Sequence, residues 1–209
     1  SHPSSKRSDI PKIPHQSSAT GMQAIPTTGV AQGIQYLEQQ NISNYKGKDK
    51  PLVVCSLGDA SVTEGEVAEA FQMAVLKKLP IIYLVQDNEW DISATAKETR
   101  AMNAYEYAKG FKGLEAYSIN GSDFIESYGV LNKVINTVRN ERRPFLVHAK
   151  VPLLNHHTSG VRKEWYRSKE DLAEHAKRDP LPLCKSQLLE FGIKESTLLK
   201  LEKKAKEKV

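Results

Sequence analysis

The sequence has little cysteine and no long hydrophobic run. Only two of its 209 residues are cysteines, Cys55 and Cys184, and their spacing matches neither a zinc site nor a disulfide framework. No apolar stretch approaches the roughly 20 residues that a transmembrane helix needs, and no signal-peptide pattern opens the sequence. We therefore expect no membrane partner and a reducing compartment, either the bacterial cytoplasm or the mitochondrial matrix.

Charge and length narrow the class of protein further. The chain carries 30 Lys and Arg residues against 25 Asp and Glu residues, for a net charge of +5. Much of the excess lies at Lys203, Lys204, Lys206 and Lys208, which favours a solvated helix end over a basic face. We therefore expect no nucleic-acid partner. A length of 209 residues suits one domain with a substantial core.

Short apolar runs alternate with segments of helical periodicity. This alternation predicts the α/β class, with a mostly parallel sheet flanked by helices. We expect strands at residues 52–57, 81–85, 116–119 and 145–150. Helices are expected at residues 25–39, from about 64, at 103–111, at 123–138, from about 168, at 185–190 and at 195–206.

The segments between these elements are expected to be loops. Residues 1–16 lack a periodic apolar pattern, and residues 91–102 and 152–167 are polar. Loops as long as residues 152–167 are usually functional in a compact domain. Pro180 and Pro182 are expected to break the chain before the helix at residues 185–190.

The first two expected strands each end in oxygen-bearing side chains. Asp59 follows the first strand within a Gly-Asp-Ala turn, and Asn88 follows the second within Gln-Asp-Asn. Open parallel sheets bind their ligands at the carboxyl ends of the strands. One carboxylate and one amide oxygen suit Mg²⁺ or Ca²⁺, with phosphate oxygens and water completing the shell.

The helix between these two strands adds to this pattern. Thr63 and Glu66 predict a capping box for a helix that starts near Glu64. The free N–H groups at the start of a helix favour an anion. The sequence therefore predicts a site for a metal-bridged pyrophosphate.

The segment from Gly58 to Asn88 resembles the thiamine diphosphate motif, in which Gly-Asp-Gly is followed, after a helix and a strand, by one or two Asn residues. Residues 58–93, the Asn-His-His-Thr-Ser-Gly run at 155–160 and the Tyr-Arg-Ser run at 166–168 together resemble the alpha subunit of thiamine diphosphate-dependent 2-oxo acid dehydrogenases. That family includes the pyruvate and branched-chain (2-oxoisovalerate) enzymes, and its alpha part is sometimes fused to the beta part. The similarity extends from about Ser17 onward.

The resemblance implies a thiamine diphosphate-binding fold, of which this chain is the diphosphate-binding module. In the family a long segment precedes the matching region, so the resemblance implies a fragment that lacks the N-terminal part. On this interpretation residues 1–24 are a loop and the remnant of a truncated segment. Residues 25–209 are then the α/β domain, with C-terminal helices from about 168.

The resemblance also implies a set of site residues. Asp59, Asn88 and the backbone carbonyl of Trp90 would bind Mg²⁺, and His157 would lie beside the cofactor as a catalytic residue. The residues implied to bind thiamine diphosphate are Gly58, Ala60, Ser61, Gln86 and His157.

Four positions depart from the family pattern. Ala60 replaces a Gly, Asp87 replaces the first Asn of a pair, and Gly160 stands where many relatives have an acid. Gln86 stands where relatives often place an Arg on the diphosphate, so a charge-assisted contact becomes a neutral one. None of these departures removes an implied metal ligand.

Each of these residues also has a purely structural interpretation. Asp59 could cap the helix that follows, and Asn88 could be a turn residue, the default use of Asn after a strand. Trp90 could be an apolar plug, and His156 and His157 could be exposed loop histidines. The spacing of Asp59 and Asn88 favours the metal site.

The implied function is oxidative decarboxylation of a small 2-oxo acid with acyl transfer to a lipoyl group. The partners would be a beta subunit, or the beta half of the same enzyme, and a lipoyl-bearing acyltransferase core. In the family the Glu that activates the cofactor belongs to the beta part, so the isolated chain is expected to be inactive. The adjacent pair His156 and His157 resembles the branched-chain type more than the pyruvate type. We expect residues 155–162 to become ordered only with cofactor and partner.

Two other functions remain open at this point. One is an acetoin dehydrogenase or transketolase-like enzyme that uses the same cofactor. The other is a non-catalytic fragment that serves only to assemble with a partner.

Overall fold

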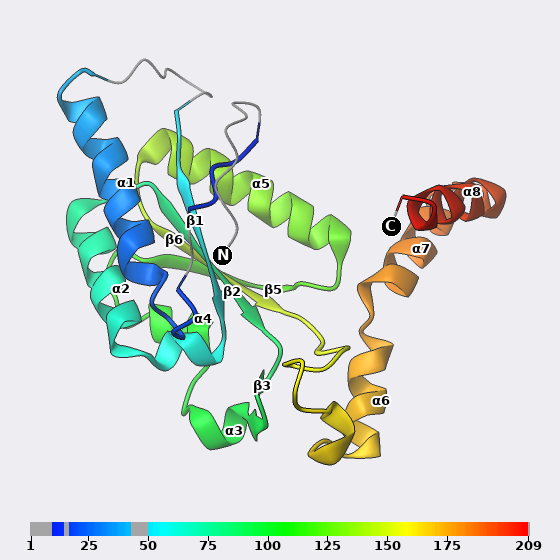
Figure 1. The fold of residues 1–209 in the computed structure, drawn as a ribbon. Coiled ribbons are helices and arrows are strands. Elements are labelled where there is room, and N and C mark those ends of the chain that lie inside the picture. The colour runs from blue at the N-terminus through cyan, green and yellow to red at the C-terminus, as the bar shows by residue number, and fades with distance from the viewer. Residues whose placement is uncertain (1–9, 15–16, 43–49, 209) are drawn as a thin grey trace.

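The computed structural model describes residues 10–14, 17–42 and 50–208. Its centre is a four-stranded, fully parallel sheet in the order β1-β2-β6-β5 (Figure 1). The strands are β1 Val53–Gly58, β2 Ile81–Asp87, β5 Glu115–Asn120 and β6 Phe145–Lys150. The α/β class and the mostly parallel sheet flanked by helices, predicted from the sequence, are therefore confirmed.

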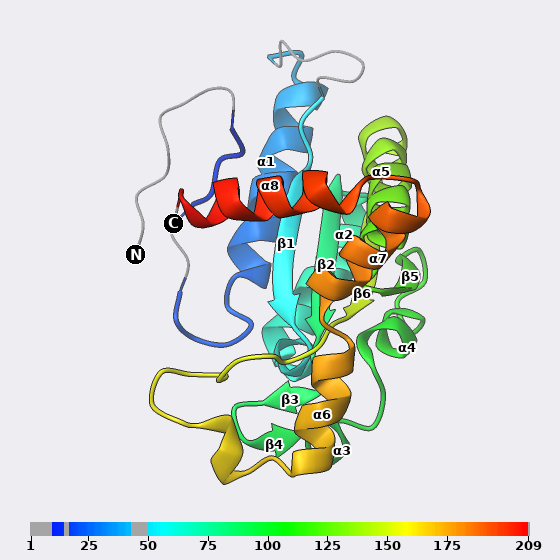
Figure 2. The ribbon, with the colours of Figure 1, turned by 90° about the vertical axis from the view of Figure 1, so that its right-hand side faces the viewer.

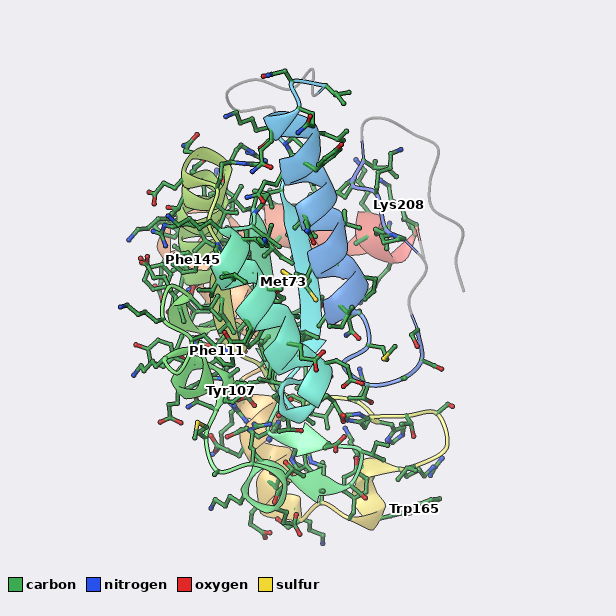
Figure 3. The ribbon with its side chains drawn as sticks, turned by 90° about the vertical axis from the view of Figure 1, so that its left-hand side faces the viewer. Met73, Tyr107, Phe111, Phe145, Trp165 and Lys208 are labelled. Carbon is green, nitrogen blue, oxygen red and sulfur yellow. The ribbon has the colours of Figure 1, made fainter. Side chains whose placement is uncertain are left out.

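Helices cover both faces of the sheet. On one face lie α1 Ala24–Gln39, α2 Gly65–Lys77 and α4 Ala104–Ala108, and Figure 3 shows α1 and α2 side by side over β1. On the other face α5 Phe124–Glu141 packs against β2, β5 and β6. Among the described residues, none of the helices is both long and apolar enough to cross a bilayer.

The two faces have separate cores. On the α1 and α2 face, Phe71 and Tyr83 are fully buried, and their ring centroids lie 4.6 Å apart in an edge-to-face arrangement. The buried hydroxyl of Tyr83 donates to the Ala70 carbonyl (3.1 Å) and lies 2.6 Å from the Thr28 hydroxyl, so it is fully paired. On the α5 face, α5 contributes Val134 and Val138 to a second core, whereas Val54 of β1 lies outside it with 51% of its surface exposed.

The C-terminal part extends away from the sheet. After β6 come the 3-10 helix η3 Lys163–Trp165 and the helices α6 Lys169–Lys177, α7 Pro180–Glu190 and α8 Glu195–Lys206. Figure 1 shows α7 and α8 standing off from the sheet, and Figure 2 shows α8 crossing in front of β1 and β2 from that distance. Among the residues of α8, only Leu198 is buried.

The predicted capping box of Thr63 and Glu66 is wrong. Residues Ala60–Thr63 form a 3-10 helix, η2, and the Thr63 hydroxyl donates back to the Ala60 carbonyl at 2.8 Å. The chain leaves β1 in this tight i→i+3 turn, which uses Thr63 before the α-helix begins. Glu64, in extended conformation, is the residue that precedes α2.

Two further predictions need correction. Residues 91–102 are not a plain loop, because they contain most of a short hairpin, β3 Trp90–Asp91 and β4 Ala94–Thr95, followed by α3 Ala96–Thr99. Pro180 and Pro182 do not break the chain; they lie in the first turn of α7, where a missing N–H costs nothing, and Asp179 caps that turn. The predicted loop at residues 1–16 falls largely outside the described residues.

Candidate functional site

The carboxyl ends of β1 and β2 lie side by side. Gly58 is in register with Gln86, so Asp59 and Asn88 emerge at the same edge of the sheet. The Asn88 backbone N–H points at Asp59 Oδ1, 3.4 Å away, and Asn88 Oδ1 accepts a hydrogen bond of 2.9 Å from the Trp90 N–H. Asp59, Asn88 and Trp90 are therefore linked by hydrogen bonds within one turn.

This group fits a hard divalent cation in its chemistry. Asp59 offers a carboxylate and Asn88 an amide oxygen, and that oxygen keeps a second lone pair beside its bond to Trp90. No cluster of three His, Cys, Asp or Glu side chains suited to a metal occurs in the part of the chain that the structure describes. The implied ligand set is not a cluster of this kind, because only Asp59 is of these residue types. Asn88 would contribute an amide oxygen and Trp90 a backbone carbonyl.

The sequence did not indicate the cation that meets Asp59. The Arg100 guanidinium bridges two acids: Nη1 pairs with Asp59 Oδ2, and Nη2 lies 2.7 Å from Asp87 Oδ1. Only 8% of the Arg100 side chain is exposed. The other Asp87 oxygen lies 2.7 Å from His148 Nε2, and His148 Nδ1 lies 3.0 Å from the Ser118 hydroxyl. A polar network thus runs from the end of β1 to β5, and it is buried except at Ser118.

The pKa values of the two carboxylates in this network are shifted in opposite directions. Burial, followed by the nearby charge of Asp87, raises the pKa of Asp59 although Arg100 opposes both effects. Burial would also raise the pKa of Asp87, but His148, Arg100 and the Glu89 N–H outweigh it and hold the pKa at about 2. Asp59 is therefore the carboxylate with more to gain from an added cation.

Local structure explains how Arg100 reaches this position. Thr95 caps α3 in a reciprocal capping box with Glu98, and the Ala96 N–H donates to the Glu89 carbonyl at 2.9 Å. These contacts close residues 89–99 into a compact loop that starts next to Asn88 and brings Arg100 back to the strand ends. Glu89 adopts a left-handed conformation (φ 66°) at the start of this loop.

Two cavities flank Arg100. One, of about 320 Å³, is lined by polar groups that include Asp87, His148, Lys150 and Arg178. The other, of about 300 Å³, lies against Asp59 and is lined mainly by apolar side chains. Neither cavity is lined by Gly58, Ala60, Ser61 or Gln86.

The implied diphosphate residues therefore lie apart from these cavities. Gln86 and Asp87 point to opposite faces of β2, as neighbours on a strand do. Gln86 is exposed on the α5 face, where its Oε1 accepts a 2.8 Å bond from the Ser56 hydroxyl. Its amide NH₂ is thereby directed away from Ser56. Ser61 is buried within η2.

The structure does not place His157 on this network. His157 is half-buried, and its Nδ1 is enclosed with no hydrogen-bond partner. Its neighbour His156 is exposed and accepts a 3.2 Å bond from the Lys163 N–H. In the described part of the chain, no hydrogen bond or ion pair joins His157 to Asp59, Asn88 or Gln86.

Buried side chains hold the base of the His157 loop, residues 152–167. The buried Arg167 donates to the Leu153 carbonyl (2.7 Å), and His175 Nδ1 accepts from the Leu153 N–H (2.9 Å). The Trp90 ring packs edge-on against Tyr166 at 5.3 Å and beneath the Arg167 guanidinium at 5.3 Å. Trp90 therefore connects the turn after β2 to the end of the His157 loop.

Sequence reasoning missed Arg100, His148 and His175. A histidine inside an otherwise apolar strand was the only available signal for His148. Arg100 and His175 lie in polar surroundings in the sequence, so their burial gave no signal.

Comparison with known proteins identifies the class. The family described as "Dehydrogenase E1 component" matches residues 2–209, and the chain belongs to this family. The motif-based resemblance is thereby confirmed.

The two relatives described next are both named as alpha subunits. The chain is 29% identical over 180 residues to the "Pyruvate dehydrogenase E1 component subunit alpha" of Rickettsia bellii, covering 85% of this chain and 53% of the relative. It is 28% identical over 174 residues to the "3-methyl-2-oxobutanoate dehydrogenase subunit alpha" of Mycobacterium tuberculosis, covering 83% of this chain and 44% of the relative. The chain spans about half the length of the curated relatives it matches.

Solved structures with partial similarity include a transketolase from Campylobacter jejuni. Its TM-score is 0.48 at 25% identity, over 62% of this chain and 19% of that one. A putative thiamin diphosphate-dependent enzyme from Mycobacterium smegmatis has a TM-score of 0.46 at 20% identity, over 64% of this chain and 22% of that one.

Proposed function

We propose that this chain is the alpha part of a 2-oxo acid dehydrogenase and holds the metal-diphosphate end of thiamine diphosphate. The observation that carries the proposal is the meeting of Asp59 and Asn88 at adjacent strand ends, in the order of the family motif. The relatives' names favour pyruvate or 3-methyl-2-oxobutanoate as the substrate. The relatives are bacterial, which favours the cytoplasm over a mitochondrial matrix.

The proposed roles follow from the donor set. Asp59, the amide oxygen of Asn88 and the carbonyl of Trp90 would bind Mg²⁺. Gly58, Ala60 and Ser61 would approach the diphosphate, and the outward NH₂ of Gln86 would donate to it. Thiamine diphosphate, when bound, supplies the electron sink that makes loss of CO₂ feasible.

His157 would act next to the reacting atoms. Its unpaired Nδ1 is free to hold or to move a proton. The beta subunit, or the beta half of a fused enzyme, would supply the rest of the active site. A lipoyl-bearing acyltransferase core would receive the acyl group.

A non-catalytic assembly role is the alternative with structural support. Arg100 already pairs with both buried acids, so the strand-end network is satisfied without a metal. An acetoin-cleaving or transketolase-like activity would use the same cofactor site, and product analysis of the reconstituted enzyme distinguishes it.

Calorimetry tests the proposal. Thiamine diphosphate is titrated with Mg²⁺ into the chain alone and into the chain with its complementary beta chain. We expect saturable, Mg²⁺-dependent binding to the assembly, lost in Asp59→Ala and retained in Glu126→Ala, an exposed carboxylate on α5. Mg²⁺-independent binding, or equal binding by both variants, would refute the proposed site.

A further inference from the structure

Arg100 occupies the oxygen that a metal at Asp59 would use or adjoin. Its guanidinium pairs with Asp59 Oδ2, while the other oxygen, Oδ1, lies 3.4 Å from the Asn88 N–H. The acid and the guanidinium are both nearly inaccessible to water, at 4% and 8% exposure of their side chains. Water therefore screens little of the interaction between this cation and any second cation at the same carboxylate.

Arg100 neutralises two acids that would otherwise repel each other. Without it, Asp59 and Asp87 would be neighbouring buried carboxylates, with His148 and the Glu89 N–H as the remaining partners of Asp87. A dication bound to Asp59 would supply that missing charge and would also repel the guanidinium. Metal and guanidinium are thus alternatives for the same carboxylate.

We propose that Arg100 acts as the counter-cation of Asp59 when no metal is bound. A divalent metal must displace the Arg100 guanidinium in order to bind Asp59. The proposal rests on the metal site proposed above and adds how that site is regulated. Displacement leaves Arg100 on Asp87 alone, because Asp87 is held in place by His148 and by the Glu89 N–H at 3.0 Å.

The surroundings of Arg100 permit this movement. Arg100 follows a single-turn helix, α3, that has no buried residue, so its withdrawal requires no repacking of the core. The cavities of about 320 and about 300 Å³ on either side give the guanidinium space.

Residues 90–100 then couple metal binding to a larger change. Trp90, whose carbonyl is a proposed ligand, starts this segment, and Arg100 ends it. Trp90 also packs on Tyr166 and Arg167 at the base of the His157 loop. Release of Arg100 from Asp59 therefore removes one of the two ion pairs that hold the end of this segment against the strand ends.

The coupling has a measurable cost in affinity. If metal binds only when Arg100 has withdrawn, the apparent dissociation constant is the intrinsic one divided by the withdrawn fraction. Removing the guanidinium removes that factor. Arg100→Gln should therefore bind metal more tightly than the natural chain, by about tenfold or more if the withdrawn fraction is about 10% or less.

Binding of Mn²⁺, followed by electron paramagnetic resonance in the full chain without cofactor, tests this directly. The matched control is Arg178→Gln, which removes the same charge from the lining of the cavity of about 320 Å³. Arg178 pairs with Glu89 at 2.9 Å and not with Asp59. We expect Arg100→Gln to tighten binding well beyond Arg178→Gln. Equal affinities for the two variants would overturn the proposal, because any gain would then come from net charge alone.

Two further arms keep the test decisive. Asp59→Asn should lose Mn²⁺ binding. If this variant binds Mn²⁺ as the natural chain does, the proposed metal site is wrong, and with it the proposed function. If Asp59→Asn loses binding but Arg100→Gln shows no gain, only the Arg100 proposal is wrong. If Arg100→Gln does not fold, ¹⁵N-arginine NMR of the natural chain decides. We expect the Arg100 guanidinium signal to shift or broaden on addition of Mg²⁺, and an unchanged signal at metal saturation would overturn the proposal.

Discussion

The strand-end network and the His157 loop use the same kinds of side chain in opposite ways. In the network, His148 is fully buried and both its ring nitrogens have partners, Asp87 and Ser118. In the loop, His157 is half-buried with an enclosed nitrogen that has none. Buried polar groups without hydrogen-bond partners are rare in the interiors of folded proteins. The difference is that the network pairs its buried histidine among the described residues, whereas the loop leaves a nitrogen of His157 without a partner there.

The largest expected effect is at the network's proposed ligand. Asp59→Ala removes a charged metal ligand and should weaken Mg²⁺-dependent cofactor binding by at least about a hundredfold, or ~2.7 kcal/mol. Calorimetry of the chain with its beta partner measures this, with Glu126→Ala as control. Unchanged affinity would show that Asp59 is not a metal ligand. The strand-end network would then have no proposed role in metal binding.

The two histidines should also differ in their effect on stability. His148→Ala leaves a buried acid short of one partner and should lower the free energy of unfolding by about 2–3 kcal/mol. His157→Ala, which breaks no hydrogen bond to any residue that the structure describes, should lower it by less than about 1 kcal/mol. Urea unfolding of both variants measures the contrast. Similar losses would show that the loop is as complete as the network.

The parts of the site that the sequence predicts are those set by local chemistry and sheet geometry. Apolar runs ending in Asp59 and Asn88 had to meet, because parallel neighbouring strands share their carboxyl edge. Arg100 could not be found this way, since its position depends on a hairpin and a capped turn in a segment that reads as polar loop. The capping box at Thr63 failed for a related reason: two local structures competed for one hydroxyl, and the tighter 3-10 turn after β1 prevailed.

The base of the His157 loop should loosen in mild acid. Burial, followed by the charges of Arg167 and Arg178, lowers the pKa of His175 against the opposing charges of Asp171 and Glu89. A lowered folded-state pKa means that the stabilisation is complete above the unfolded value of about 6.5 and is lost as pH falls through the folded value. Protonation at Nδ1 also breaks the bond from the Leu153 N–H.

We expect a loss of about 1 kcal/mol between pH 7.5 and pH 5 in the natural chain that is absent in His175→Gln. Urea unfolding at the two pH values measures it, with the exposed His156→Gln as the matched control. The same pH dependence in all three proteins would mean that His175 does not hold the loop.

The smallest expected effect concerns the diphosphate contact. Gln86→Arg should replace a neutral hydrogen bond by a charge-assisted one and tighten cofactor binding by about 1 kcal/mol, or roughly fivefold. Gln32→Arg, an exposed position on α1, controls for the added charge. A gain no larger than that of the control would place the diphosphate away from the α5 face of β2.

A crystal structure of the chain with its beta partner, grown with thiamine diphosphate and Mn²⁺, tests the central claim most directly. The account predicts an anomalous peak within about 2.2 Å of an Asp59 carboxylate oxygen and the Asn88 amide oxygen. A peak elsewhere, with Asp59 uncoordinated, would contradict it.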